Sequence, residues 1–170
     1  LADVAADGQV GLRDGRVLAS LTQRRSATRF RPCISIRANI KCVRSDGRSA
    51  SLTAPNGRAQ HELVAAAMFD GQTPPNVLAL NEAHGTGTAL GDPIEAGALA
   101  AAVLSAREEE LAVGGVKANI GHAEPAAGMT GLLKLASGLR AGEAAPNAQL
   151  QALNPHVNSV LGGGTSALPV

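Results

Sequence analysis

The feature that most constrains the fold is a regular alternation of helical and strand patterns between residues 57 and 142. The apolar positions predict, in order, a helix that ends near Gly71, a strand over 77–83, a helix over 93–107, a strand over 111–116 and a helix from Pro125 to a stop at Gly142. Strands separated by single helices favour a largely parallel sheet with helices packed on it. The sequence therefore predicts an α/β fold.

The ends and buried faces of two of these helices can be predicted in more detail. Asp92 can cap the second helix, with Pro93 at its first position and Glu95 at its third. The segment 107–110, Arg-Glu-Glu-Glu, is expected to form the solvated end of that helix. In the third helix, the residues expected on the buried side are Leu132, Leu133, Leu135, Ala136 and Leu139.

Composition places the chain among soluble globular proteins, with 45% hydrophobic and 17% charged residues in a length of 170. The formal net charge of +1 favours neither nucleic acid nor an acidic membrane as the main partner. No segment approaches the roughly 18 apolar residues of a membrane span, and no signal peptide opens the chain. Two cysteines make no disulfide framework, so a reducing compartment is expected: the cytoplasm, with a plastid left open.

The first chemical signal is a histidine at the end of the first predicted strand. His84 is followed by Gly85 and Gly87, which let the backbone pass close to a ligand. A neutral imidazole can donate its N–H to a developing oxyanion or exchange a proton. Thr86 and Thr88 add hydroxyls two residues apart, which suit an elongated polar ligand such as an amide-bearing arm. Considered alone, a histidine in this position is more often structural.

A phosphate-binding loop is the alternative interpretation of the same turn. Gly85, Gly87 and Gly91 follow the spacing G-x-G-x-x-x-G, which is one position off the dinucleotide fingerprint. The Gly-Lys-Ser/Thr sequence of nucleotide-binding P-loops is absent as well. Nucleotide binding is therefore disfavoured.

A second histidine loop, from Lys117 to His122, follows the second predicted strand. In a β-α-β unit both strand ends reach the same edge of a parallel sheet, so the imidazoles of His84 and His122 are expected to converge near Lys117. Such a group would stabilise negative charge on a substrate carbonyl. A metal site would need a third ligand, and no nearby carboxylate has a recognised ligand spacing. His61, on the polar side of a helix, and His156, in a loop, are expected to be uninvolved.

Six segments together resemble the β-ketoacyl synthase family. The two histidine motifs read Glu-Ala-His-Gly-Thr-Gly-Thr-Ala-Leu-Gly-Asp-Pro-Ile-Glu-Ala over 82–96 and Val-Lys-Ala-Asn-Ile-Gly-His over 116–122. Supporting matches, in the family's order, are the segments 46–49, 52–57, 126–128 and 154–157. The resemblance is greatest to ketosynthase domains of type I polyketide synthases. It is strong from about Asp46 to Val157 and faint before that.

The resemblance implies the C-terminal half of a thiolase-like fold, layered αβαβα and incomplete here, and a homodimer in the intact protein. It implies decarboxylative condensation, in which a cysteine holds the acyl chain and an acyl carrier protein delivers a malonyl-type thioester on its phosphopantetheine. No cofactor is expected to bind the chain directly. On this interpretation His84 and His122 promote decarboxylation and stabilise the enolate, and Lys117 supports the histidine loop. Thr86 and Thr88 would contact the phosphopantetheine arm.

The part of the family pattern that supplies the nucleophile is missing. The family's nucleophile lies in a Thr-Ala-Cys-Ser-Ser-like elbow upstream of the first histidine motif, and neither Cys33 nor Cys42 has such surroundings. Neither is expected to be the nucleophile. Residues 1–50 are interpreted as a degenerate end of the ketosynthase N-terminal half, and residues 51–170 as its C-terminal half. Two functions stay open: part of a polyketide β-ketoacyl synthase, or a truncated, non-catalytic fragment that acts at most in binding or dimerisation.

Overall fold

The computed structural model describes residues 3–4, 10–13, 16–20, 36–37, 41–49, 54–148, 150–162 and 165–169. The strands are β1 (Asp3–Val4), β2 (Val10–Arg13), β3 (Arg16–Ser20), β4 (Ile36–Arg37), β5 (Leu78–Glu82), β6 (Leu111–Gly114) and β7 (Ser166–Ala167). The α-helices are α1 (Gly57–Asp70), α2 (Gly91–Ala102), α3 (Lys117–Ile120), α4 (Ala127–Ala141) and α5 (Pro155–Leu161). Short 3-10 helices are η1 (Pro75–Val77), η2 (Leu104–Ala106) and η3 (Glu124–Ala126).

Within the described ranges, five strands form one sheet in the order β2-β3-β5-β6-β7, and β1 pairs with β4 separately. β5, β6 and β7 are parallel neighbours, whereas β2 pairs with β3, and β3 with β5, in antiparallel fashion. The two strands predicted from the sequence are therefore confirmed and parallel. The register places Glu82 beside Gly114, so the loops after β5 and β6 leave the same edge of the sheet.

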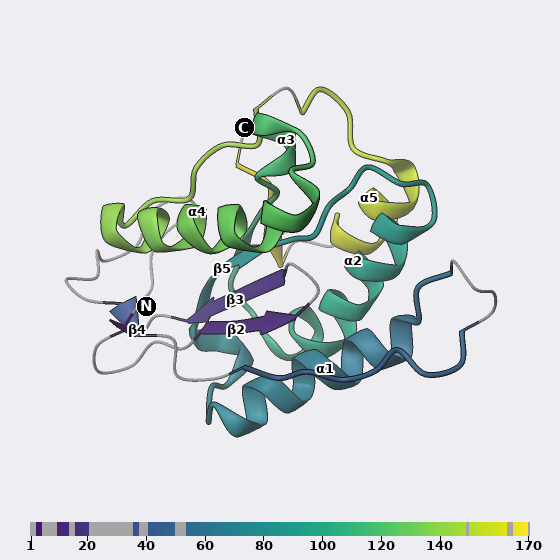
Figure 1. Ribbon diagram of the computed structural model, residues 1–170, viewed down its shortest axis with the longest axis horizontal. Helices are drawn as coiled ribbons and strands as arrows, with labels where there is room; N and C mark the ends of the chain where they lie inside the picture. Colours follow the sequence, from purple (N-terminus) through teal and green to yellow (C-terminus); the bar gives the residue numbers. More distant parts are fainter. Residues whose placement is uncertain are drawn as a thin grey trace.

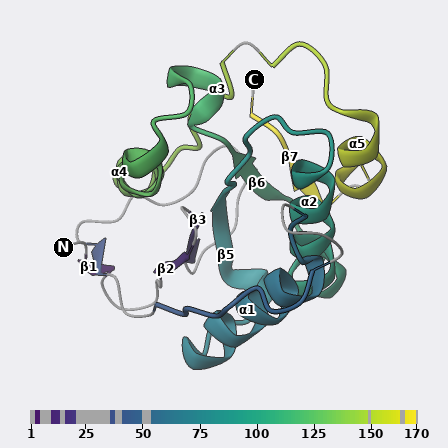
Figure 2. The same ribbon diagram turned by 45° about the vertical axis from the view of Figure 1, so that its right-hand side comes forward.

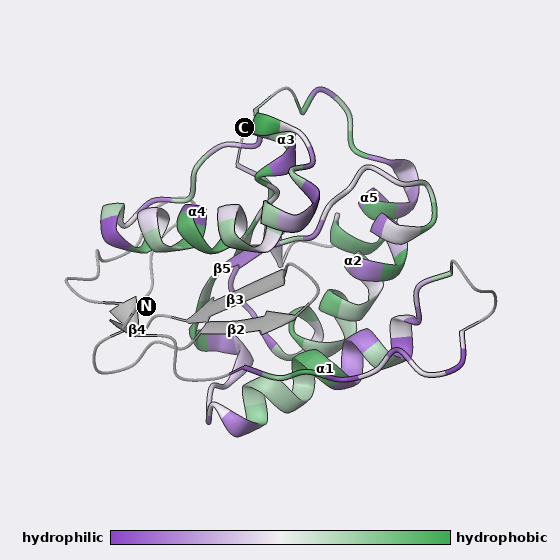
Figure 3. Ribbon diagram, in the orientation of Figure 1, coloured by the Kyte–Doolittle hydropathy of each residue, from purple (hydrophilic) through white to green (hydrophobic). Residues whose placement is uncertain are grey.

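Helices cover both faces of this sheet: α1, α2 and α5 lie on one side and α4 on the other (Figure 1, Figure 2). Leu111 and Val113, two residues apart on β6, both belong to the core on the first side because alternate residues of a strand share a face. The other buried members of this core are Val64, Met68, Leu78, Ala96, Leu99, Val103, Leu104, Val157 and Leu161. Figure 3 shows apolar and polar residues alternating along the covering helices, as expected of helices with one buried side.

The start of α1 is fixed by Asn56. Its side-chain oxygen accepts hydrogen bonds from the backbone N–H groups of Arg58 (3.1 Å) and Ala59 (3.2 Å), which the first turn of a helix leaves without partners. Its amide nitrogen donates to the carbonyls of Asp46 (2.9 Å) and Arg48 (3.1 Å). The turn near Gly47 is thereby attached to the beginning of α1.

The predicted start of α2 is wrong by two residues. The helix begins at Gly91, with Leu90 as its N-cap residue, so Asp92 lies inside the first turn instead of capping it. Its carboxylate accepts from backbone N–H groups of the preceding loop, at Gly87 and Thr88. The cap prediction fails because the loop folds back over the helix start and supplies donors to the same carboxylate.

The prediction of a solvated segment over 107–110 is wrong at Arg107, whereas the three glutamates that follow it are exposed as expected. Arg107 is only 8% exposed, and α2 has already ended at Ala102. Its guanidinium donates to four backbone carbonyls, those of Pro75 (2.6 Å), Leu78 (3.0 Å), Glu109 (2.7 Å) and Glu110 (3.1 Å). Burial lowers the pKa of Arg107 because desolvation disfavours the charged form. The side chain therefore binds the turn before β5 to the turn before β6.

The buried side of α4 differs from the prediction at one position. Leu135 and Leu139 are buried as expected, but Leu133 is 59% exposed. The buried stripe instead continues through small residues: Gly131 and Gly138 are buried, and a Cβ on Gly138 would lie 3.2 Å from a methyl group of Leu80 on β5. Glycine thus allows α4 to approach the sheet closely. The predicted stop is confirmed, since Gly142 adopts a left-handed conformation with φ 69°.

One further prediction concerns α5. His156, expected in a loop, lies exposed in the first turn of α5, where its backbone N–H donates to the side chain of Asn154 (2.9 Å).

Over the described ranges, the helices are too short or too polar to span a bilayer.

Candidate functional site

The loop that carries His84 is held by a carboxylate from α2. Glu95 accepts hydrogen bonds from the backbone N–H groups of His84 (2.7 Å) and Gly85 (3.0 Å). Hydrogen bonds to an ionised acceptor are stronger than those between neutral groups, so the backbone at the end of β5 is fixed to the first turns of α2. The sequence predicts only a helix-start role for Glu95, whereas in the structure it orients the histidine.

The next turn of the same loop is held by Asp92. Its two carboxylate oxygens accept from the backbone N–H groups of Gly87 (3.1 Å) and Thr88 (3.3 Å). Gly87 has φ 79°, a left-handed conformation that favours glycine, and this turn directs both amides at the carboxylate. Burial raises the pKa of Asp92, and the nearby Glu95 adds to the effect, while the two amides partly oppose it.

The second histidine is placed by α3 and by the residue before it. Gly121 ends α3 with φ 78°, again a conformation that favours glycine, and the chain turns there to present His122. His122 Nδ1 accepts a hydrogen bond from the backbone N–H of Glu124 (3.1 Å). An imidazole nitrogen that accepts carries no proton, so the neutral ring has its proton on Nε2. His122 therefore presents Nε2–H as a donor.

The two imidazoles do converge. Their ring centroids lie 5.7 Å apart, with an interplanar angle of 89°. His84 is half-buried and His122 is exposed, so the pair stands at the surface of the described chain. Two N–H donors at this separation can approach one oxygen atom from two directions, which is the arrangement needed to stabilise a developing oxyanion.

The other residues predicted for the site lie around this pair. Lys117 is the first residue of α3, half-buried, at the start of the segment that carries His122. Thr86 and Thr88 line a cleft of about 560 Å³ together with His84. Thr88 Oγ1 also accepts from the backbone N–H of Gly91 (3.1 Å). The cleft is within the size range of about 300–1,000 Å³ usual for small-molecule sites.

A metal centre finds no support in the described part of the chain, where no three His, Cys, Asp or Glu side chains are grouped closely enough to hold an ion.

Two buried charges beneath the histidine loops were not predicted from the sequence. Glu82, the last residue of β5, is 2% exposed and forms an ion pair with Lys134 of α4 at 2.9 Å. A carboxylate inside an apolar strand needs a cation or several donors nearby, so its position in the run Leu-Ala-Leu-Asn-Glu was a usable signal. The partner, Lys134, could not be identified from sequence spacing because it lies on α4, far along the chain from Glu82.

The thiol of Cys42 lies in surroundings that disfavour the thiolate. Its Sγ donates to Asp70 Oδ2 at 3.4 Å. Burial raises the pKa of Cys42, and the hydrogen bond and negative charge of Asp70 raise it further. A thiol with a raised pKa is a weak nucleophile at neutral pH. This agrees with the prediction that Cys42 is not a catalytic nucleophile; Cys33 lies outside the described residues.

Replacing Asp70 with Asn should accelerate alkylation of Cys42. Loss of the negative acceptor lowers the thiol pKa, so we expect a rate increase of about two- to fivefold with iodoacetamide at neutral pH, less than the gain in thiolate because its nucleophilicity also falls. Mass spectrometry of the peptide that contains Cys42 measures the rate. Glu62→Gln, an exposed change in the same helix, is the control and should leave the rate unchanged. An unchanged rate in the Asp70 variant would contradict the assigned hydrogen bond.

Comparisons with known proteins give one family. The sequence profile of the β-ketoacyl synthase C-terminal domain matches residues 38–151. A phenolphthiocerol/phthiocerol polyketide synthase of Mycobacterium tuberculosis is 44% identical over 117 residues, which are 68% of this chain and 6% of that protein. A spectinabilin polyketide synthase system protein of Streptomyces orinoci is 41% identical over 156 residues, 90% of this chain and 4% of that protein.

Solved structures agree with the sequence matches. An oxazolomycin ketosynthase domain from Streptomyces albus superposes with a TM-score of 0.69 at 32% identity, over 92% of this chain and 23% of the domain. The ketosynthase from module 1 of the bacillaene synthase of Bacillus amyloliquefaciens gives 0.68 at 33% identity, over 75% of this chain and 25% of that structure. The α/β fold is therefore a partial thiolase-like fold, as predicted. The chain belongs to the β-ketoacyl synthase family and carries the C-terminal part of a polyketide synthase ketosynthase domain.

Proposed function

We propose that the chain supplies the two catalytic histidines, His84 and His122, of a site for decarboxylative condensation of acyl thioesters with malonyl-type thioesters. The observation that carries the proposal is the convergence of His84 and His122, whose ring centroids are 5.7 Å apart. In this reaction the malonyl carboxylate leaves as CO₂, and its bonding electron pair is delocalised onto the thioester oxygen as an enolate. The enolate carbon then attacks an acyl thioester and expels the thiolate of the cysteine that held the acyl group.

The two imidazoles are held in position by different hydrogen bonds. His122 offers Nε2–H as a donor because its Nδ1 accepts from Glu124. His84 is fixed through its own backbone N–H, which donates to Glu95. Donors that are already oriented stabilise the enolate oxygen without reorganising during the reaction. Lys117, at the start of the second loop, would add a positive charge that favours the enolate.

The threonine loop would receive the carrier-protein substrate. Thr86 and Thr88 line the same cleft as His84 and carry hydroxyl groups. Hydroxyl groups can exchange hydrogen bonds with the amides of a phosphopantetheine arm. The arm would be delivered by an acyl carrier protein, and the chain would hold no cofactor of its own.

The nucleophilic cysteine of this proposal has to come from outside the described residues. Cys42, bonded to Asp70, is unsuited to the task. The chain spans 6% or less of the two curated relatives described and 23–25% of the two solved ketosynthases. The division at about residue 50, a homodimer and a cytoplasmic (or plastid) location stay predictions. The alternative function is a non-catalytic fragment that acts at most in binding or dimerisation.

A chimera separates the two functions. Residues 54–162 would replace the corresponding segment of the bacillaene module 1 ketosynthase, which supplies the rest of the fold. We expect CO₂ release from a malonyl carrier protein and formation of a β-ketoacyl product. The matched control is the same chimera with the host cysteine changed to alanine, which should form no condensation product. A folded chimera that forms no more β-ketoacyl product than this control would support the non-catalytic alternative.

A further inference from the structure

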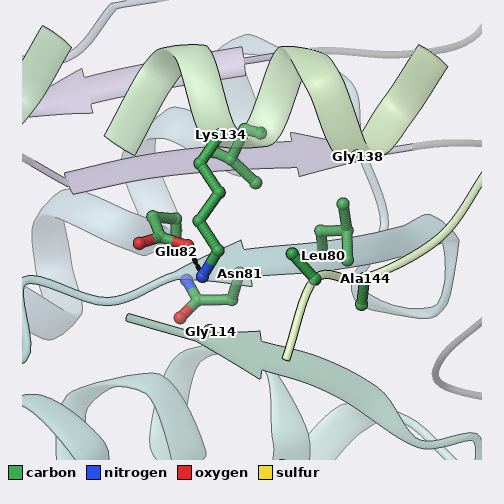
Figure 4. Close-up of a pocket in the computed structure, with 9 residues that line it drawn as sticks. Leu80, Asn81, Glu82, Gly114, Lys134, Gly138 and Ala144 are labelled. Carbon is green, nitrogen blue, oxygen red and sulfur yellow. Dashed lines mark ion pairs between the residues drawn. The ribbon is translucent and has the colours of Figure 1, made fainter. Parts of the chain in front are cut away.

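Two buried charges lie directly beneath the histidine loops, and the chemistry proposed above makes no use of them. Glu82 is 2% exposed, and the side chain of Lys134 is 14% exposed. Their Oε2 and Nζ atoms are 2.9 Å apart, and Figure 4 shows Lys134 reaching from α4 across the end of β5 to this carboxylate. No substrate could touch a carboxylate this deeply buried without a rearrangement, so a direct catalytic role is excluded.

The other oxygen of Glu82 has a second partner. Oε1 accepts a hydrogen bond from the backbone N–H of Val116, which is buried directly before α3. The carboxylate at the end of β5 therefore binds two other parts of the fold: the residue directly before the second histidine loop, and helix α4. Such charge-assisted contacts restrict geometry more than neutral ones do.

These contacts bracket the segment that carries His122. Val116 precedes that histidine and Lys134 follows it, on either side of α3 and the turn that contains Gly121. His84 lies two residues beyond Glu82 itself. The entry and the exit of one histidine segment are thus both attached to the carboxylate that stands next to the other histidine.

The neighbouring strand leaves room for this arrangement. Gly114 lies beside Glu82 in the register of β5 and β6. A Cβ at Gly114 would be 2.7 Å from Lys134 Nζ and 3.0 Å from Glu82 Oε2. A side chain there would force the ends of these two side chains to shift, so the glycine leaves room for the ion pair in its present position.

Stability alone gives a weak reason for such a pair. The desolvation of two buried charges commonly offsets their attraction, and well-packed apolar residues often stabilise a fold as well or better. A buried pair does fix the relative positions of the elements it joins. The geometry here, with contacts on both sides of a histidine segment, points to positioning.

We propose that Glu82 is a positioning residue: through Val116 and Lys134 its carboxylate sets the separation and orientation of the His84 and His122 imidazoles. The chemical purpose of that separation rests on the proposed function. The separation itself is a property of the chain and can be measured without any activity.

The test uses the 170-residue chain with isotope-labelled histidine. It contains four histidines, so its ring signals can be assigned by single substitutions. We expect magnetisation transfer between the ring protons of His84 and His122, which are in edge-to-face contact. Glu82→Gln and Lys134→Met should abolish the transfer, because each removes one charge of the ion pair that attaches α4 to the end of β5. Lys134→Arg, which keeps the cation, should restore it at least in part.

A matched control distinguishes positioning from general loosening. Leu139→Ala removes a fully buried side chain from the same helix as Lys134 but leaves the ion pair, so the transfer should persist. If either single charge variant fails to fold, the double variant Glu82→Gln/Lys134→Met takes its place, since it leaves no unbalanced buried charge, and the same loss is expected. Three outcomes would overturn the proposal. The transfer persists in the folded charge variants, it is missing in the original chain, or it is lost equally in Leu139→Ala.

Kinetics of the chimera supply an independent readout. Glu82→Gln should lower kcat for decarboxylation by about tenfold or more while KM stays within about twofold, because small displacements of catalytic groups are costly and Glu82 does not touch substrate. An unchanged kcat alongside lost transfer would contradict a positioning role in the reaction. A chimera that is inactive in every form contradicts the proposed function, and the magnetic resonance result then decides on the positioning role by itself.

Discussion

Replacing His122 with alanine in the chimera is expected to lower the rate of malonyl decarboxylation by about 10²–10³-fold, the usual effect of removing one oriented oxyanion donor. The effect should fall on kcat, because the Nε2–H donor is needed most where negative charge develops on the thioester oxygen. His84→Ala should have an effect of similar size. The measurement is CO₂ release from a malonyl carrier protein under saturating conditions.

Two further variants sharpen this result. His122→Asn keeps an N–H donor on a shorter side chain and should retain more activity than the alanine variant. His156→Ala is the matched control, since His156 is exposed on α5 and outside the site, and its kcat should not change. A His122→Ala chimera with kcat within about twofold of its parent would remove the second histidine from the mechanism.

The second large effect is expected at Arg107. Arg107→Leu should reduce the free energy of unfolding by about 3 kcal/mol, because one buried and three partly buried hydrogen bonds are lost and a buried carbonyl left without a donor costs about 1–3 kcal/mol. The carbonyls affected belong to Pro75, Leu78, Glu109 and Glu110. Urea unfolding of the full chain, followed by circular dichroism, measures the change.

Arg58→Leu is the matched control for Arg107. The side chain of Arg58 is 87% exposed, and its ion pair with Glu62 lies on the surface of α1. Surface ion pairs contribute about 0–1 kcal/mol, so this variant should unfold at nearly the same urea concentration as the original chain. If the two arginine variants were equally stable, the buried position of Arg107 would be wrong.

The parallel core of the fold and the meeting of the two histidines could be predicted from the sequence. Both follow from local signals: apolar runs of strand length, helical periodicity between them, and a histidine just beyond each run. Right-handed β-α-β connections then restrict the arrangement of the strands, since they bring the ends of consecutive strands to one edge of the sheet. His84 and His122 could be expected to lie close together for that reason.

The errors have a common physical cause, which is that a local residue pattern does not determine which other part of the chain a side chain contacts. Asp92 stands where a capping residue should stand, but the preceding loop supplies the amides that it binds. Arg107 belongs to a strongly polar run, yet carbonyls distant in sequence surround it. Leu133 continues an apolar run on the exposed side of α4. The link between Glu82 and Lys134 depends on long-range packing, which local patterns do not encode.

The carboxylates that hold the first histidine loop also determine which ligands it can reject. The glycine spacing of this loop resembles that of a phosphate cradle, in which backbone N–H groups point at an anion. Here four such N–H groups, from His84, Gly85, Gly87 and Thr88, already donate to Glu95 and Asp92. A nucleotide phosphate would meet two negative charges and no available donor among these four. The backbone of this loop is thus closed to phosphate by its own acidic side chains, and a ligand with negative charge has to be met by side chains such as the His84 imidazole.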